Sequence, residues 1–385
     1  MGLFRTHSLF LAIISLCMIL AEGMYKPSVA IIDEKAFHLE VVGGLLNALA
    51  SYSESTTVYL HPLNFPDRPV DFGFVDIILR AKAQLRGLPV LSMPHHDVLI
   101  FVSPEYRIDY VREFIDKSKP RAVIAMIHNG DAESILQMKT LHPNLHIFTL
   151  SPHVAKFAGE RLDMKLDWML PLAGHVPSKP CADVQLMKGC ISGFAIQGNM
   201  DSRRRNYTLI WNQLDVRLNA SDALKNDDRF LINVVGSGSP SKLEVPVRLE
   251  HRVRPHVNLR FDDFYDLIYH NFALIPTIAS ENYYDRKFSS TVITSLVTGV
   301  PIIVQERFLK SYTFLTPSTV VLQSDEEEIM DVGIRVLNTP AEKMSELRGN
   351  VNHLREQLNQ RATSQLKSVI DSTKKKLDLG TLPRN

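Results

Sequence analysis

Two patterns of apolar and polar positions alternate along the first half of this chain. Short, nearly continuous apolar runs predict buried strands at residues 28–33, 56–62, 97–103, 121–128 and 145–151. Between them, apolar residues recur every three or four positions, which predicts amphipathic helices at residues 39–49, 74–85, 106–116, 132–139 and 154–161. Buried strands that alternate with helices are typical of a parallel sheet covered on both faces. We therefore expect one doubly wound domain over residues 24–175.

The alternation stops between residues 168 and 189, a stretch with three prolines and no sustained periodicity. We expect residues 176–189 to link two domains. A second alternation predicts strands at 190–198, 230–236, 273–276, 301–305 and 319–322, and helices at 205–214, 262–270, 291–298, 326–337 and 341–376. The predicted fold is α/β, with two Rossmann-like doubly wound parallel-sheet domains facing a cleft. The second domain spans residues 190–340, and a C-terminal helix and tail span 341–385.

Residues 272–305 say most about function. They combine a strand, a polar turn that carries Glu281, a Ser-Ser-Thr helix start at residues 289–291, a helix closed by Gly299, and a second strand. Parallel α/β sheets bind ligands outside the carboxyl ends of their strands, which is where this pattern places the polar residues. The segment therefore predicts a ligand-binding unit.

The first residues depart from globular composition. Basic residues precede an apolar run from Ser8 to Ala21, and Ala21 and Gly23 are small residues where a signal peptidase cuts. The run is shorter than the about 20 residues that span a bilayer, so residues 1–23 are predicted to be a cleaved signal peptide. The alternative is an uncleaved type II membrane anchor. In both cases we expect the rest of the chain in the secretory pathway, in the ER or Golgi lumen or secreted.

Asparagines and cysteines bear on that compartment. Asn206 and Asn219 each begin an Asn-x-Ser/Thr triplet, the acceptor sequence for N-glycosylation, although such triplets also occur by chance. Once the signal peptide is removed, the remaining cysteines are Cys181 and Cys190, close together in the proline-rich stretch. In an oxidising lumen they predict a local disulfide, and the alternative is two ordinary buried thiols.

Charge and motifs argue against several classes of function. The net charge of +1 gives no electrostatic reason to expect nucleic acid as a partner. The dinucleotide fingerprint Gly-x-Gly-x-x-Gly follows none of the predicted strands, because the Gly-Ser-Gly turn at residues 236–238 lacks the third glycine. His95, His96 and Asp97 could be metal ligands, but neighbouring side chains of an extended segment point in opposite directions, so a loop is the preferred interpretation.

The order of elements in the second half resembles the C-terminal domain of the GT-B glycosyltransferases, two-domain enzymes that use nucleotide sugars. In that domain a glycine-ended strand precedes basic residues, a second strand ends in a glycine turn, and an acidic and aromatic helix start precedes a Glu-bearing loop, a helix and a Gly-x-Pro turn. The matching features here are Gly198 followed by Arg203, Arg204 and Arg205, the turn at Gly236, residues 261–265, the loop with Glu281, and Gly299-Val300-Pro301. The weaker likeness of the first half rests on His128 and residues 150–155.

The resemblance implies a donor site for a nucleotide sugar. Without a metal, the leaving pyrophosphate needs cations, backbone amides and helix N-termini to meet its growing negative charge. The residues that match the family's donor contacts are Gly198, Arg203, Arg204, Arg205, Gly236, Glu281, Ser289, Ser290 and Thr291. Taken alone, Ser289 could be a plain helix N-cap, Glu281 a solvated acid paired with Arg286, and the arginine run a solvated loop.

One position departs from the family. Retaining members carry a second glutamate on the helix before Gly-x-Pro, and Thr294 stands in that register, where a hydroxyl cannot match the two strong acceptors of a carboxylate. An inverting mechanism would need a base in the first half, for which Asp33, His38 and His128 are the candidates, although a histidine at such a place is often structural. No Asp-x-Asp sequence occurs, so no metal cofactor is expected.

The resemblance therefore implies a glycosyltransferase that moves a sugar from a nucleotide sugar, its co-substrate, to a glycan, protein or lipid acceptor. Two other hypotheses stay open. One is a catalytically silent protein of this fold that binds nucleotide sugar or glycan, and the other is a two-domain extracellular binding protein. Contact with a membrane is expected only if the N-terminal segment is not cleaved.

Overall fold

The computed structural model describes residues 27–34, 38–50, 52–53, 55–60, 73–88, 93–181, 189–202, 205–278 and 280–380. The predicted signal peptide (1–23) lies outside the described residues, as do Arg203 and Arg204 of the predicted donor site. None of the helices in the described ranges combines the length and apolar character that a membrane crossing requires.

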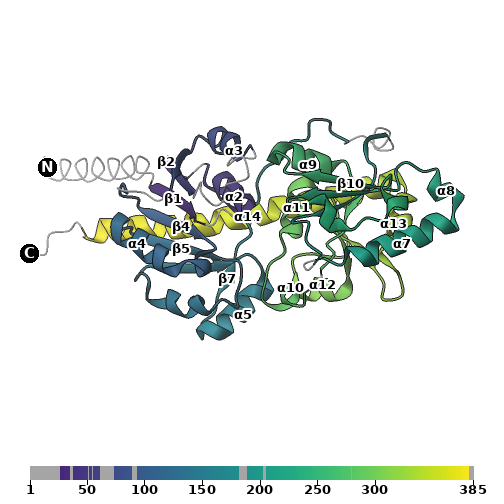
Figure 1. The fold of residues 1–385 in the computed structure, drawn as a ribbon. Coiled ribbons are helices and arrows are strands. Elements are labelled where there is room, and N and C mark those ends of the chain that lie inside the picture. Colours follow the sequence, from purple (N-terminus) through teal and green to yellow (C-terminus); the bar gives the residue numbers. More distant parts are fainter. Residues whose placement is uncertain are drawn as a thin grey trace, which may run out of the picture.

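The N-terminal domain is built on a seven-stranded parallel sheet in the order β3-β2-β1-β4-β5-β6-β7 (Figure 1). The strands are β1 (Ser28–Asp33), β2 (Ser55–Leu60), β3 (Gln84–Gly87), β4 (Val98–Val102), β5 (Ala122–Ile127), β6 (Leu145–Thr149) and β7 (Asp167–Trp168). The winding direction reverses between β1 and β4, where Val29 pairs with Val98. Residues that follow these two strands therefore lie at the switch point where such sheets bind ligands.

The C-terminal domain repeats this winding on a smaller scale. Its strands are β8 (Phe194–Gln197), β9 (Ile232–Gly236), β10 (Val253–Val257), β11 (Ala273–Leu274), β12 (Ile303–Gln305) and β13 (Val321–Gln323). They form parallel sheets in the orders β10-β9-β8-β11 and β12-β13, and a parallel bridge between Leu274 and Ile302 continues one into the other. The predicted α/β fold class with parallel sheets is confirmed.

Helices cover both faces of each sheet. In the N-terminal domain they are α2 (Leu39–Leu49), α3 (Phe74–Arg80), α4 (Ile108–Ser118) and α5 (Pro152–Leu162), with 3-10 helices η2 (Pro104–Tyr106) and η3 (Glu133–Thr140). In the C-terminal domain they are α7 (Tyr207–Ala220), α8 (Asp222–Lys225), α9 (Phe261–Tyr269), α10 (Asn282–Asp285), α11 (Ser290–Thr298), α12 (Glu306–Ser311) and α13 (Ile329–Leu337), with η4 (Pro240–Leu243) and η5 (Val247–Leu249). The last helix, α14 (Ala341–Gly380), serves both domains.

α14 runs along both domains, as the long yellow helix of Figure 1 shows. Its buried Val351 and Leu366 belong to one continuous apolar cluster that also contains Val42 of α2 and Val297 of α11. Arg355 of α14 donates a hydrogen bond to the Val297 carbonyl at 3.1 Å, at the end of α11. Burial of this shared cluster is the main favourable term that holds the two sheets together.

The connection between the domains packs directly on α2. A Cβ at Gly44 would lie 2.2 Å from the carbonyl oxygen of Pro171, so only glycine allows this approach. The Asn47 amide donates to the Leu172 carbonyl at 3.1 Å, and the Leu172 N–H donates to the Asn359 side chain of α14 at 2.8 Å. Gly44 thus allows residues 171–172 to pass closely between α2 and α14.

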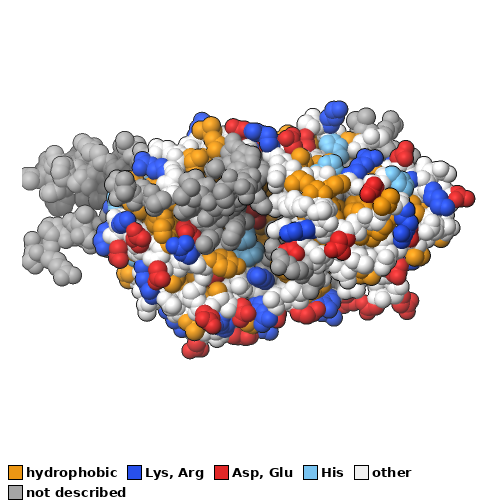
Figure 2. Space-filling model, viewed as in Figure 1, with side chains coloured by type: hydrophobic (Ala, Val, Ile, Leu, Met, Phe, Trp, Pro, Cys, Tyr) orange, Lys and Arg blue, Asp and Glu red, His pale blue; other side chains and the backbone are white. Residues whose placement is uncertain are grey.

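A second contact between the domains joins α3 to the start of α9 by two crossed ion pairs. Arg80 binds Asp262 with N–O distances of 3.2 and 3.0 Å, and Arg260 binds Asp76 at 2.5 Å. Elsewhere on the face drawn in Figure 2, basic and acidic side chains are intermixed without a large area of one sign. This view agrees with the near-zero net charge.

Two predicted helices are wrong in detail, and two edge strands were not predicted. The helix predicted over residues 74–85 ends at Arg80, and the edge strand β3 follows it. All four residues of β3 are exposed, so no apolar pattern marked this strand. β10 is likewise a polar edge strand, with exposed Arg254 and Pro255, and was not predicted. The helix predicted over 132–139 is the 3-10 helix η3.

Candidate functional site

The two domains meet at the carboxyl end of the N-terminal sheet. Asn129, after β5, forms an antiparallel bridge with Lys287, and the N–H of Phe288 donates to the His128 carbonyl at 3.3 Å. Lys287 and Phe288 immediately precede the N-cap of α11. The structure therefore places strand-end residues of one domain beside the predicted donor helix of the other.

The three base candidates of the N-terminal domain come together here. The imidazole rings of His38 and His128 stack with centroids 3.9 Å apart and planes at 27°. The buried Asp33 carboxylate, at the end of β1, accepts the N–H of His38 at 3.3 Å, and a Glu40 oxygen lies 3.4 Å from His38 Nδ1. Burial acts to lower the pKa of His38, but the nearby carboxylates, first Glu40, outweigh it and raise the pKa above its usual value.

Glu105 belongs to the same cluster, and the sequence analysis missed it. It lies in η2 after β4, and its Oε1 accepts the N–H groups of His128 at 3.0 Å and Asn129 at 2.8 Å. Its Oε2 is buried without a hydrogen-bond partner among the described residues. Burial raises the pKa of Glu105 to about 7, although the backbone hydrogen bonds act to lower it. Its position directly after a buried strand at the switch point was the available signal.

In the C-terminal domain, the ends of β8 and β9 approach each other through glycine. A Cβ at Gly236 would lie 1.9 Å from the Gly198 carbonyl oxygen, and Gly198 has a φ of 121°, a region that favours glycine. Arg205 donates to the carbonyls of Gln197 at 2.6 Å and Asn199 at 2.9 Å. The Arg205 guanidinium therefore bridges the loop after β8 and uses at least two of its N–H groups for these carbonyls.

The start of α11 is tied to that loop. The Thr291 hydroxyl donates to the Gln197 side-chain oxygen at 3.0 Å, and the Ser289 N–H donates to the Tyr312 hydroxyl at 3.0 Å. Ser290 is the first helical residue, and the Ser289 side chain at the N-cap makes no cap hydrogen bond. The first N–H groups of a helix lack intrahelical acceptors and its dipole favours negative charge, so this end suits an anion.

Two other predicted donor residues have different surroundings. The Glu281 carboxylate is 80% exposed and pairs with Arg307 at 2.5 Å rather than with Arg286, and Arg307 lies 3.8 Å from the centre of the Tyr284 ring. Thr294 is only 4% exposed within α11. A buried hydroxyl therefore occupies the position where the family's retaining members carry a carboxylate.

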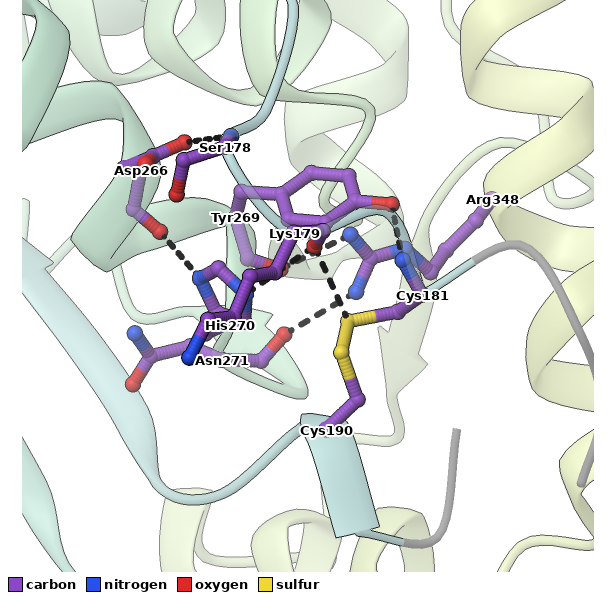
Figure 3. Close-up of a disulfide and its surroundings, with 9 residues drawn as sticks. All are labelled: Ser178, Lys179, Cys181, Cys190, Asp266, Tyr269, His270, Asn271 and Arg348. Atoms are coloured by element: carbon purple, nitrogen blue, oxygen red, sulfur yellow. Dashed lines mark hydrogen bonds between the residues drawn. A yellow bond between two sulfur atoms is a disulfide. The ribbon is translucent and has the colours of Figure 1, made fainter. Parts of the chain in front are cut away.

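Cys181 and Cys190 form a disulfide, with Cα atoms 5.8 Å apart (Figure 3). The Cys181 N–H donates to the Tyr269 hydroxyl at 2.9 Å, and Arg348 of α14 donates to the Tyr269 carbonyl at 2.8 Å. The ligand atoms of both cysteines and His270 lie within 4.8 Å of one another, but the sulfurs are bonded to each other instead of being thiolates. The disulfide thus joins Cys181 to Cys190, while the hydrogen bonds through Tyr269 link Cys181 to α9 and α9 to α14.

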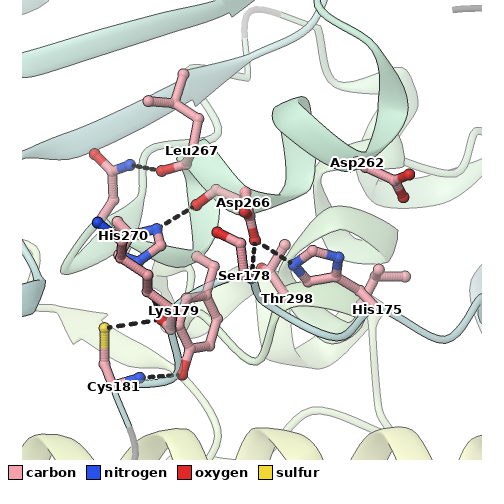
Figure 4. A network of polar contacts seen from close by, with 12 residues as sticks. His175, Ser178, Lys179, Cys181, Asp262, Asp266, Leu267, His270 and Thr298 are labelled. Carbon is pink, nitrogen blue, oxygen red and sulfur yellow. Dashed lines mark hydrogen bonds and ion pairs between the residues drawn. The ribbon is translucent and has the colours of Figure 1, made fainter. Parts of the chain in front are cut away.

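Asp266 of α9 holds the same connection further upstream, as Figure 4 shows. Its Oδ1 accepts the Ser178 N–H at 2.9 Å and lies 3.4 Å from His175 Nε2. Burial lowers the pKa of His175 although Asp266 acts in the opposite direction. These contacts fix the connection to the C-terminal domain.

Solved structures with the same architecture are glycosyltransferases. A glycosyltransferase from Rickettsia africae ESF-5 matches with a TM-score of 0.60 and 10% identity, over 90% of this chain and 98% of that one. Anabaena Alr3699/HepE, solved in complex with UDP and glucose, matches with a TM-score of 0.57 and 11% identity, over 89% and 100%. Sucrose-phosphate synthase from Thermosynechococcus elongatus matches with a TM-score of 0.54 and 12% identity, over 90% and 100%. Neither a protein-family model nor a curated protein matches the sequence.

These neighbours are GT-B glycosyltransferases, and the chain shares their fold over nearly its whole length. The resemblance inferred from the order of sequence motifs is confirmed at the level of the fold. Identities of 10 to 12% mark the chain as a divergent example of it.

Proposed function

We propose that this protein is a glycosyltransferase that moves a sugar from a nucleotide-sugar donor to an acceptor hydroxyl in the secretory pathway. The observation that carries the proposal is the meeting of the α11 start with the stacked His38 and His128 across one domain interface. The donor class is supported by the Anabaena neighbour, which was solved with UDP and with UDP-glucose. Since one fold hosts many functions, the local arrangement matters more than the fold.

The C-terminal domain supplies the donor half of the reaction. The amides at Ser290 and Thr291 would receive the diphosphate, and the glycines at 198 and 236 let the backbone approach it closely. When the bond between the anomeric carbon and the diphosphate oxygen breaks, its electron pair stays on that oxygen, and the helix N-terminus stabilises the charge. We propose that no metal ion takes part, because the chain lacks an Asp-x-Asp sequence.

The N-terminal domain supplies the base. In an inverting transfer, the acceptor oxygen forms a bond to the anomeric carbon while an imidazole nitrogen takes its proton. His38 suits this role because the surrounding carboxylates raise its pKa and stabilise the imidazolium that forms. The hydrogen bond from the backbone N–H of His38 to Asp33 fixes the backbone at this position, and the stacked His128 ring limits how the imidazole can turn.

The glycosylation triplets and the disulfide support the proposed compartment. Asn206 and Asn219 are exposed at the two ends of α7, and Asn206 Oδ1 accepts the Leu209 N–H at 3.1 Å, which leaves its amide nitrogen for a glycan. The disulfide between Cys181 and Cys190 suits an oxidising lumen. Together with the predicted signal peptide, these features favour a lumenal or secreted glycoprotein.

A catalytically silent protein that binds nucleotide sugar is the second candidate. Thr294, a buried hydroxyl at the position of the retaining members' glutamate, favours it. Both candidates require nucleotide binding, and they differ in whether the donor is consumed.

Calorimetric titration of the mature protein with UDP, GDP and ADP tests both candidates. We expect one nucleotide to bind, and absence of binding by folded protein would overturn both. Ser290→Asp places a negative charge at the start of α11. It should lower the affinity for that nucleotide by about tenfold or more without lowering the stability of α11. Ser318→Asp, on an exposed turn, is the matched control and should bind as the parent does. Release of nucleoside diphosphate from the donor then separates the enzyme from the silent protein.

A further inference from the structure

We propose that His153 of α5 is a positioning residue that holds the start of α11 from across the domain interface. Both hydrogen bonds form only when the imidazole carries two protons, so mild acid strengthens the contact between His153 and the segments next to α11. The inference rests on the proposed function, in which α11 binds the donor diphosphate.

His153 makes two polar contacts, both to carbonyl oxygens of the C-terminal domain. Its Nδ1 lies 3.1 Å from the Ser311 carbonyl and its Nε2 lies 3.1 Å from the Lys287 carbonyl. A carbonyl oxygen can only accept a hydrogen bond. A neutral imidazole has one N–H and can satisfy one of the two carbonyls, whereas the imidazolium satisfies both. Because His153 is only 9% exposed, its imidazole has little access to water, and these two carbonyls are the acceptors within its reach.

The two carbonyls lie on either side of the α11 start. Lys287 belongs to the segment that leads into Ser289, the N-cap. Ser311 precedes Tyr312, whose hydroxyl accepts the Ser289 N–H at 3.0 Å. The rings of His153 and Tyr312 are also in contact, with centroids 4.5 Å apart at 61°. One hydrogen bond of His153 is therefore connected to the α11 start through Lys287, and the other through Ser311 and Tyr312.

Charged groups on the contacting elements largely neutralise one another. Asp285 of α10 acts to raise the pKa of His153, and Arg286 lies 3.8 Å from that carboxylate. On α12, Glu306 and Lys310 pair with each other at 3.7 Å. The other charged side chains of the contacting segments are Asp131, Lys156, Glu160, Arg161, Lys287 and Arg307. Asp131 pairs with Arg161 at 3.9 Å and with Arg286 at 3.6 Å, and Arg307 pairs with Glu281.

Burial is the largest effect on His153 and lowers its pKa below the usual value, although the two carbonyls and Asp285 act to raise it. At neutral pH the ring is therefore mostly neutral, and one carbonyl lacks its N–H. Acidification adds the second proton to the His153 ring, and both carbonyl acceptors are already within hydrogen-bonding distance.

The test compares the affinity for the bound nucleotide, UDP first, in the parent and in His153→Gln from pH 8 to pH 5. Glutamine offers N–H donors but does not titrate, and the ratio of the two affinities cancels the protonation of UDP itself. We expect the ratio of parent to variant affinity to rise toward acid by roughly threefold to tenfold, because hydrogen bonds from a charged donor are stronger. His353→Gln, exposed on α14, should show a constant ratio. A constant ratio for His153→Gln overturns the proposal.

A measurement without nucleotide separates this inference from the proposed function. Nitrogen chemical shifts of His153 should report two N–H groups in acid, and amide hydrogen exchange of residues 287–292 should slow in the parent relative to the variant at the same pH. This pattern without nucleotide binding would refute the proposed function and keep His153 as the holder of α11. Equal exchange in parent and variant at every pH would overturn the inference itself.

Discussion

The rings of His38 and His128 stack 3.9 Å apart at the carboxyl edge of the N-terminal sheet. One precedes α2 and the other follows β5, and they meet because β1, β4 and β5 are neighbouring parallel strands that end at the same edge. The Glu105 carboxylate accepts the backbone N–H of His128 at 3.0 Å. Two imidazoles and a buried carboxyl group therefore share one small region, and each can be tested by a substitution that keeps its shape.

We expect His38→Gln to lower the rate of sugar transfer by roughly 100-fold or more, because a general base contributes about 10²- to 10⁴-fold. Nucleotide affinity should stay unchanged, since the proposed function places His38 on the acceptor side. Steady-state kinetics and calorimetry check the two parts. If His128→Gln loses the rate while His38→Gln keeps it, the base is His128. Full activity in both variants would remove the pair from the mechanism.

Glu105 should make the protein less stable at alkaline pH. Its pKa is about 7 in the folded protein against 4.5 for the free group, so folding favours the protonated form. The stability that this group contributes is complete below pH 4.5 and is lost as the pH rises through about 7. Glu105→Gln keeps an oxygen for the N–H groups of His128 and Asn129 but cannot ionise.

We therefore expect Glu105→Gln to gain stability over the parent at pH 8, on the order of 3 kcal/mol, and to match it at pH 4. Denaturant unfolding at both pH values provides the measurement. A difference that is the same at pH 4 and pH 8 would mean that the carboxyl does not titrate in this way.

Loss of the disulfide should destabilise the C-terminal domain. Replacing both Cys181 and Cys190 by serine opens a loop of sequence separation 9, for which chain entropy predicts a cost of about 2–3 kcal/mol. Thermal unfolding of the double variant checks this, and the parent in reducing agent is the control that should show a similar shift. An unchanged Tm in the variant would show that the contacts of Tyr269 and Arg348 suffice to anchor the connection.

The crossed ion pairs between α3 and α9 should contribute modestly and in a salt-dependent way. Arg80→Asp places like charges opposite each other and should cost roughly 0.2–1 kcal/mol, the range of exposed pairs. Adding Asp262→Arg should recover most of the loss. Unfolding at low and high salt measures both effects, because salt screens exposed charges. Equal losses in the single and double variants would show that the pair does not couple the domains.

The buried strands of this fold were predictable, and the edge strands were not. β4 and β5 are buried at every position, so their apolar runs marked them in the sequence. β3 is exposed at every position and is a strand only because β2 offers it hydrogen bonds. The same reason explains why β10 escaped prediction.

The candidate site shows the same division. Glycines at 198 and 236 and the Ser-Ser-Thr start of α11 were found from their order along the chain, because turn and helix-start chemistry is local. The partners of charged residues were not found. Arg205 closes its own loop, and Glu281 pairs with Arg307 rather than Arg286, because such choices depend on which segments fold next to each other.

Periodicity and short-range backbone preferences were enough to predict the alternation of strands and helices, the fold class and the position of helix α11. The cluster of His38, Glu105 and His128, and the contacts of His153 with the segments before and after α11, could be found only in the folded protein. These contacts join residues that are far apart in the chain, so no local sequence pattern encodes them. Their geometry exists only after two parallel sheets have closed and met along a shared interface.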